Sequence, residues 1–383
     1  MTLADAYDAA APPKASRATL GKLAELLERS GIDLDDVARV QKVRAWQGFY
    51  KGDDGEAHTV DMHGIELVPS WADGPQWPVA KPGPVVRLPK AKATTAPVGW
   101  PNAVVLPDMQ IGYFHGPDGL EPTHDEAAIA AALAVTKAAK PAVVVLVGDN
   151  LDLPEFGRYR LTPAFMRTTQ PAIDRATTLC AELRRAAPNA RIVWLAGNHE
   201  ERLPNWLLDN AAAAHGLRQG NTPESWPVMS VPFLTRMDDH DIEYRPGYPA
   251  SHYWITERLK VVHGELVRSN GSTAAAYLSR EKTSSIFGHV HRREYAARTR
   301  DDHDGPREIM AASPGCLCRI DGAVPSVKGG VDLDGRPLRR SEDWQQGLAV
   351  VPFDPDSGHF DYEQVAIRQG VARWRGREYG GNA

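Results

Sequence analysis

Five short segments of this 383-residue chain place oxygen or nitrogen ligands directly after runs of Val, Ile or Leu. In chain order they are Asp108-Met109-Gln110, Gly148-Asp149-Asn150-Leu151-Asp152, Gly197-Asn198-His199-Glu200, His263-Gly264 and Gly288-His289-Val290-His291. Carboxylate and amide oxygens suit hard divalent cations, and imidazole suits Mn, Fe, Zn and Ni. A single motif of this kind would carry little weight. Five at expected strand ends predict a site for two metal ions.

The spacing within these segments indicates how the ligands are shared. Two cations about 3.5–4 Å apart need a carboxylate between them. Asp149 follows a glycine at the end of an apolar run and is the natural bridge. His289 and His291 are two residues apart, which aims both imidazoles to one side of an extended segment. The chemistry expected of such a pair is hydrolysis of a phosphoester by a water molecule that the metals activate.

The elements that must position these side chains alternate between helices and strands. Residues 123–140 are Ala-rich and predict a helix, and residues 142–147 form a continuous apolar run typical of a strand that is buried on both faces. After about residue 242 the pattern changes to short strands, with one helix at about 272–282. We therefore expect a layered α/β domain in which a second sheet packs on the first.

The residues before this domain have a different character. Leucines recur at helical spacing between residues 19 and 29, a second short helix is expected at 33–39, and residues 51–70 could form a small hairpin. Two helices with a glycine between them could be a helix-turn-helix that contacts DNA, or an appendage that docks on the main domain or a partner. The expected organisation is an N-terminal helical and hairpin segment at 1–72, a Pro-rich linker at 73–101, the main domain at 102–370 and a mobile basic tail at 371–383.

Composition excludes some classes of protein. The net charge of −5 provides no global basic field for nucleic acid, although two bound cations would make the site itself positive. The three cysteines are too few and odd in number for a disulfide framework, which points to a reducing compartment. The acidic N-terminus lacks the features of a signal peptide, and the apolar run at 142–147 is too short to cross a bilayer. We expect a cytoplasmic protein with no membrane contact.

Cys316 and Cys318 could supply two thiolates to a metal. However, no second cysteine pair accompanies them, and they follow an apolar strand. Buried structural cysteines are therefore the favoured interpretation.

The ordered motifs resemble those of the calcineurin-like metallophosphoesterase superfamily, whose signature is Asp-x-His, Gly-Asp-x-x-Asp, Gly-Asn-His-Asp/Glu, a lone His and Gly-His-x-His. The resemblance covers roughly residues 102–316. It implies a four-layer αββα sandwich, with two mixed β-sheets flanked by helices and the metals at strand ends. It also implies ligands for two metals: Asp108, Gln110 and His291 at the first, Asn198, His263 and His289 at the second, and Asp149 at both. By the same resemblance, His199 would act on the transition state or the leaving oxygen. Asp152 would support the site from outside the ligand shell.

Gln110 departs from the pattern, because the family usually has His at this position. An amide oxygen is a harder and weaker donor than imidazole, which favours Mn²⁺ or Mg²⁺ over Zn²⁺ at the first metal. In the alternative, Gln110 hydrogen-bonds a water molecule and does not ligate. We expect two divalent cations, Mn²⁺ first, with Mg²⁺, Fe, Zn²⁺ and Ni²⁺ open.

The residues around Gln110 and the small N-terminal segment are similar to phage-encoded members grouped with the double-strand-break-repair nuclease branch. This similarity favours a DNA nuclease or phosphodiesterase, which would act in the host cytoplasm if the chain is phage-encoded. A small-molecule phosphodiesterase or phosphomonoesterase, and a non-catalytic DNA-binding or assembly protein with a degenerate site, remain alternatives. The basic residues considered for substrate contact are Arg158, Arg160, Arg167, Arg292 and Arg293.

Overall fold

The structure, a computed structural model, describes residues 17–32, 37–53, 55–69, 99–116, 119–158, 161–303, 305–322, 324, 331–332, 336, 338 and 341–381. The chain divides into two units, Met1–Ala93 and Thr94–Ala383. The division falls inside the predicted Pro-rich linker, of which all but the last three residues lie outside the described part.

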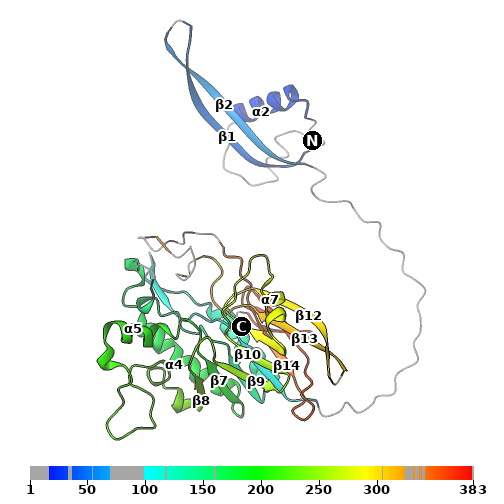
Figure 1. Ribbon diagram of the computed structural model, residues 1–383. Helices are drawn as coiled ribbons and strands as arrows, with labels where there is room; N and C mark the ends of the chain where they lie inside the picture. The colour runs from blue at the N-terminus through cyan, green and yellow to red at the C-terminus, as the bar shows by residue number, and fades with distance from the viewer. Residues whose placement is uncertain are drawn as a thin grey trace, which may run out of the picture. The chain divides into compact units, whose positions relative to one another are not determined.

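The described residues of the first unit form one helix and one long hairpin (Figure 1). Helix α2 spans Arg17–Arg29, strand β1 spans Val37–Lys51 and strand β2 spans Ala57–Pro69, and the two strands pair antiparallel. The predicted second helix at 33–39 is wrong over its described part, because β1 already begins at Val37; residues 33–36 lie outside the described residues. β-branched and aromatic residues such as Val43 and Phe49 favour the strand. The described residues of this unit therefore form no helix-turn-helix.

The second unit contains two large mixed sheets. The strands of the larger sheet are β3 Asn102–Leu106, β6 Val143–Leu146, β7 Arg191–Leu195, β8 Ile242–Arg245, β14 Gly347–Pro352, β15 Glu363–Arg368, β16 Val371–Trp374 and β17 Arg377–Gly380, in the spatial order β17-β16-β15-β14-β3-β6-β7-β8. Those of the smaller sheet are β9 His252–Thr256, β10 Leu259–Val262, β11 Ser284–Phe287, β12 Arg293–Asp302 and β13 Gly305–Pro314, in the order β12-β13-β11-β10-β9.

Helices and short elements complete this unit. The helices are α3 Glu126–Ala139, α4 Thr169–Ala186, α5 Arg202–Asn210, α6 Val231–Leu234 and α7 Thr273–Arg280. A small hairpin pairs β4 Tyr113–Gly116 with β5 Gly119–Pro122, and single 3-10 turns lie at Pro154–Phe156, Pro163–Phe165, Ala212–Ala214 and Met237–His240. No helix among the described residues is long and apolar enough to cross a membrane.

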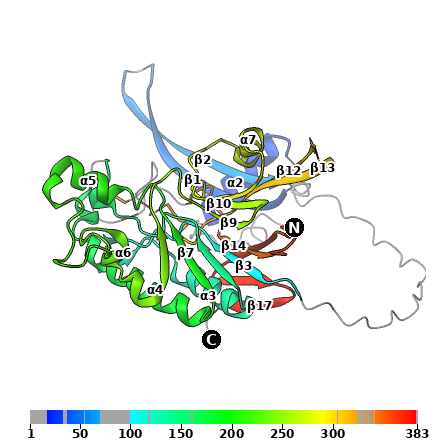
Figure 2. The same cartoon turned by 60° about the horizontal axis from the view of Figure 1, so that its bottom comes forward.

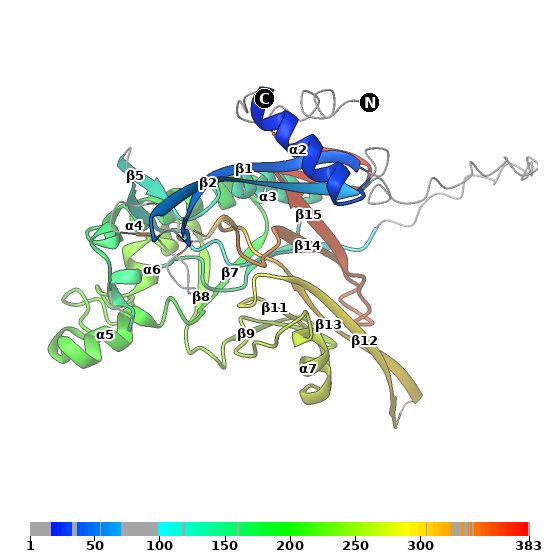
Figure 3. The ribbon, with the colours of Figure 1, turned by 90° about the horizontal axis from the view of Figure 1, so that it is seen from above.

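The alternation of side chains along β3 shows how the layers pack. Val104 and Leu106 belong to a core shared with α3 and α4, whereas Ala103 and Val105 belong to a core shared with the smaller sheet, because successive side chains of a strand point to opposite faces. A third core joins α7 to the smaller sheet. Figures 2 and 3 show α3 on one side of the two sheets and α7 on the other. The expected α/β domain with two mixed sheets is confirmed.

The predicted mobile tail is wrong for residues 371–381, which form the hairpin β16–β17 and extend the larger sheet beyond β15. Ala372 and Trp374 are buried against the core that contains α3, while Arg373 points outward and pairs with Glu378. The apolar and basic residues therefore alternate as they do in a strand with one buried face. Arg373 therefore lies on the exposed face of a strand and not in a mobile tail.

Trp374→Ala tests the hairpin. Removing a buried Trp side chain is expected to lower the free energy of unfolding by about 3 kcal/mol, measured by urea denaturation. Arg373→Ala is the control, because an exposed ion pair contributes at most about 1 kcal/mol. Equal stability of the Trp374→Ala variant and the wild type would show that the C-terminal segment does not pack on the domain.

Candidate metal centre

The five sequence segments meet at one edge of the paired sheets. β3, β6 and β7 are parallel neighbours in one sheet, and β10 and β11 are parallel neighbours in the other. Each of these strands ends just before a polar side chain: Asp108 after β3, Asp149 after β6, Asn198 after β7, His263 after β10 and His289 after β11. The carboxyl ends of parallel strands lie at the same edge, so the fold collects residues that are far apart in the sequence.

The backbone at this edge is strained. Five of the predicted ligands have a positive φ, in the left-handed region that side chains other than glycine rarely adopt: Asp108, Gln110, Asp149, His289 and His291. Such conformations cost about 1–3 kcal/mol each and persist where surrounding contacts impose them. Their concentration in the ligand set marks this edge as a functional site.

The first group of ligands surrounds Asp149. Ligand atoms of Asp149, His263 and His289 lie within 4.8 Å of one another and could hold a metal ion. Nε2 of His263 is 3.3 Å from Asp149 Oδ2 and 3.2 Å from Asn198 Oδ1. The other ring nitrogen of His263 lies 3.2 Å from the carbonyl oxygen of Val147, to which it can donate. This second contact orients the ring with Nε2 toward the carboxylate.

The electrostatics of this group favour a cation. Burial lowers the pKa of His263, but the charges of Asp149 and Asp108 outweigh that effect and raise the pKa to about 9. Burial and the neighbouring His263 lower the pKa of His289 to about 4. Burial raises the pKa of Asp149, yet the three nearby histidines hold it well below its usual range. The buried carboxylate is thus charged and bordered by a neutral imidazole, a donor pair suited to a divalent cation.

Asp108 organises the neighbouring positions. Its carboxylate accepts the backbone N–H of His289 at 2.9 and 3.2 Å, and Nε2 of His291 lies 3.2 Å from its Oδ1. A side chain at Gly288 would collide with this carboxylate, so glycine is required there. Gln110 is buried, and its backbone N–H donates to the carbonyl oxygen of Asp149 at 2.9 Å. The predicted ligands of both metals are therefore brought together, while their assignment as ligands stays a prediction.

Glu200 has a role that the sequence interpretation missed. Its buried carboxylate accepts five N–H groups at 2.8–3.3 Å: the backbone N–H of Asp149, Asn150, Leu151 and Gly197, and the indole N–H of Trp194. Burial and the charge of Asp149 raise the pKa of Glu200, while the donated N–H groups oppose the shift. The side chain ties the loop after β6 to the loop after β7. Its place at the end of the Gly-Asn-His-Glu motif was the available signal.

His199 lies between the carboxylate of Asp152 and the guanidinium of Arg202. Its Nδ1 is 3.0 Å from Oδ1 of Asp152, and its Nε2 is 2.8 Å from Nη2 of Arg202. Because a guanidinium only donates, Nε2 accepts and the ring proton lies on Nδ1, which is close to Asp152 but makes no hydrogen bond with the described residues. The backbone N–H of His199 donates to Asp149 at 2.8 Å. Arg202 was not predicted; it lies three residues after His199, where α5 begins.

The arginines predicted to contact substrate differ in their exposure and in their partners. Arg158 is exposed, and Arg160 lies outside the described residues. Arg292 has partners within the protein: it forms an ion pair with Glu294 at 3.0 Å and donates a hydrogen bond to the carbonyl oxygen of Arg268 at 2.5 Å. Arg167 is exposed, and Arg293 is partly buried. The geometry gives Arg292 a structural partner and leaves its contact with substrate a prediction.

A second group of possible ligands adjoins the first. Ligand atoms of His291, Cys316 and Cys318 also lie within 4.8 Å of one another, and all three side chains are buried. The two sulfur atoms make this donor set softer than the one around Asp149.

Comparison with known proteins does not assign the chain to a family. No protein-family model matches it, and no curated protein matches it either.

Glu200→Gln tests the link between the two loops. The amide replaces one acceptor oxygen by a donor, so at least two buried N–H groups lose their acceptor. At about 1–3 kcal/mol for each, urea denaturation is expected to show a loss of about 3 kcal/mol. Glu224→Gln, at an exposed position, is the control. A Glu200→Gln variant as stable as this control would contradict the role given to the carboxylate.

Proposed function

We propose that this protein is a metal-dependent phosphodiesterase with a dinuclear centre, and that it has the calcineurin-like four-layer fold. The observation that carries the proposal is the convergence of Asp108 and His291 with the group of Asp149, His263 and His289 at one edge of two packed sheets. The strand-end ligands and outer helices agree with what the sequence resemblance implies.

The donor set fits two divalent cations. Asp108, Gln110 and His291 would hold the first, Asn198, His263 and His289 the second, and Asp149 would contact both. Oxygen and imidazole donors without a thiolate in this set favour Mn²⁺. When bound, the metals would lower the pKa of a water molecule and neutralise charge on the phosphoryl oxygens. The chain supplies the positions, because the backbone contacts of Asp108, Asp149 and His263 fix their side chains before a ligand arrives.

His199 and Arg202 are proposed to act on the leaving oxygen. Nε2 of His199 lies 3.6 Å from Asp149 Oδ2, so the pair borders the carboxylate that would contact both metals. The carboxylate of Asp152 lies 3.0 Å from Nδ1 of the imidazole, and Arg202, 3.4 Å from the same carboxylate, adds a positive charge beside it. Positive charge and N–H groups at this position would stabilise the negative charge that develops as the ester bond breaks.

DNA is the proposed substrate. The observation that favours it lies in the first unit, where β1 exposes Trp46 and Tyr50 by 47% and 57%. Arg44 is also exposed, and the regular pairing of β1 places these three side chains on the same face of the strand. Aromatic side chains that stack on bases, together with basic residues that contact phosphates, are typical of single-strand binding surfaces.

Asp149→Asn tests the phosphodiesterase. The amide cannot bridge two cations as a carboxylate does, so Mn²⁺-dependent cleavage of single-stranded DNA and of bis-p-nitrophenyl phosphate is expected to be lost. Asp209→Asn, the same change at an exposed position of α5, is expected to retain both activities. Circular dichroism checks the fold. Full activity of a folded Asp149→Asn variant would rule out the proposed centre, and turnover of the small diester without DNA cleavage would favour a small-molecule substrate.

His199→Ala separates rate from metal binding. We expect unchanged metal content and a loss of about 10²-fold in DNA cleavage, because an alkoxide leaves poorly without help. The loss with bis-p-nitrophenyl phosphate should be much smaller, since p-nitrophenolate is a good leaving group. His215→Ala, at an exposed histidine, is the control. Equal cleavage of DNA by His199→Ala and the wild type would disprove this role.

A further inference from the structure

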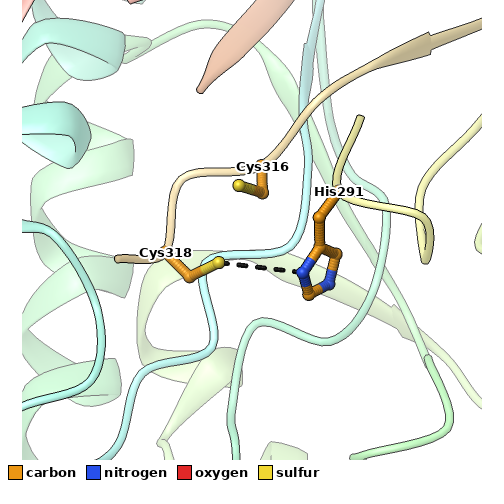
Figure 4. A group of neighbouring side chains, drawn as sticks. All are labelled: His291, Cys316 and Cys318. Atoms are coloured by element: carbon orange, nitrogen blue, oxygen red, sulfur yellow. Dashed lines mark hydrogen bonds between the residues drawn. The ribbon is translucent and has the colours of Figure 1, made fainter. Parts of the chain in front are cut away.

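Two cysteines and a histidine form a compact group beside the proposed centre. Cys316 and Cys318 follow β13 through the turn at Gly315, and both are fully buried. His291 reaches the same place from the loop after β11 and is 4% exposed. Figure 4 shows the sulfur of Cys318 turned toward a ring nitrogen of His291, with Cys316 beside them. Three side chains from two segments thus present their donor atoms to one point.

The separations suit a metal better than a hydrogen bond. Sγ of Cys318 lies 3.9 Å from Nδ1 of His291. With Zn–S bonds of about 2.3 Å and Zn–N bonds of about 2.0 Å, sulfur and nitrogen in a tetrahedral zinc site lie about 3.5 Å apart. A shift of a few tenths of an ångström would therefore complete the coordination geometry.

Two further contacts orient the imidazole ring of His291. Nε2 lies 3.2 Å from the carboxylate of Asp108, and Trp344 packs edge-on against the ring at 4.2 Å between centroids. A histidine that binds metal through one nitrogen usually donates the other N–H to a carboxylate or carbonyl. Asp108 provides that acceptor when Nδ1 is the ligand atom.

We propose that Cys316, Cys318 and His291 Nδ1 bind one Zn²⁺ in a thiolate site distinct from the Asp149 group. Zinc displaces the two thiol protons to solvent, and three protein ligands leave its fourth position to a water molecule. Thiolates select Zn²⁺ over Mn²⁺ and Mg²⁺. The two sites share His291, since a neutral imidazole offers one nitrogen lone pair.

Sharing His291 makes zinc a competitor of the first metal. With Zn²⁺ on Nδ1, Nε2 keeps its proton, donates to Asp108 and is no longer a ligand for the proposed centre. This consequence rests on the proposed function, whereas zinc binding by the cysteines does not.

Co²⁺ is the probe for the thiolate site. The full-length, metal-stripped protein titrated with Co²⁺ is expected to develop sulfur-to-cobalt charge-transfer absorption that saturates at one equivalent and disappears when Zn²⁺ is added. Cys316→Ser and Cys318→Ser should each abolish the absorption. Cys180→Ser, at the buried cysteine of α4, is the matched control and should retain it. Absence of the absorption in the wild type, or its persistence in both Cys316→Ser and Cys318→Ser, would overturn the proposal.

Two further measurements separate this site from the hydrolytic one. Asp149→Asn should retain the absorption, so a protein without phosphodiesterase activity can still bear out the zinc site. In the active protein, Zn²⁺ should inhibit Mn²⁺-dependent turnover of the wild type and of Cys180→Ser more strongly than that of Cys318→Ser. Equal inhibition of all three would refute the sharing of His291.

Discussion

The hydrogen bonds to the Glu200 carboxylate are the constraint on which the site depends. A buried carboxylate is costly unless its oxygens are satisfied, and charged acceptors bind N–H groups more strongly than neutral ones. Four donors from two loops and the indole N–H of Trp194 in β7 meet this requirement, and they hold Asp149 in its left-handed conformation. Glycine is needed where these loops touch, since a side chain at Gly197 would collide with Asp149 and one at Gly148 would collide with Gly197.

The predicted ligands also connect the two sheets. His263, at the end of β10 in the smaller sheet, contacts the carbonyl oxygen of Val147 after β6 in the larger one. Asp108, after β3 of the larger sheet, accepts the backbone N–H of His289 after β11 of the smaller one. The hydrophobic core between the two sheets brings these loops close together. Packing energy from the sheets can thus support the unfavourable backbone conformations at the site.

The sequence predicted the positions of the site residues better than their partners. Asp108, Asp149 and His263 follow apolar runs, and strand ends are recognisable from such runs. The contact of Arg202 with His199, and the placing of His291 beside two cysteines, depend on how separate loops pack, which local patterns do not encode. The terminal hairpin was not predicted because its two strands are only four residues long and rich in arginine, so the alternation of buried and exposed side chains is brief. The N-terminal hairpin was missed in part because a short run beginning at Val37 suits a helix or a strand equally well.

Anomalous diffraction at the manganese edge, from crystals of the full chain grown with Mn²⁺, tests the two-metal centre most directly. Two peaks are predicted, one beside Asp108 and His291 and the other beside Asn198, His263 and His289, with the carboxylate of Asp149 in contact with both. Peaks elsewhere in the protein, or no peak at this edge of the sheets under saturating Mn²⁺, would contradict the proposed centre.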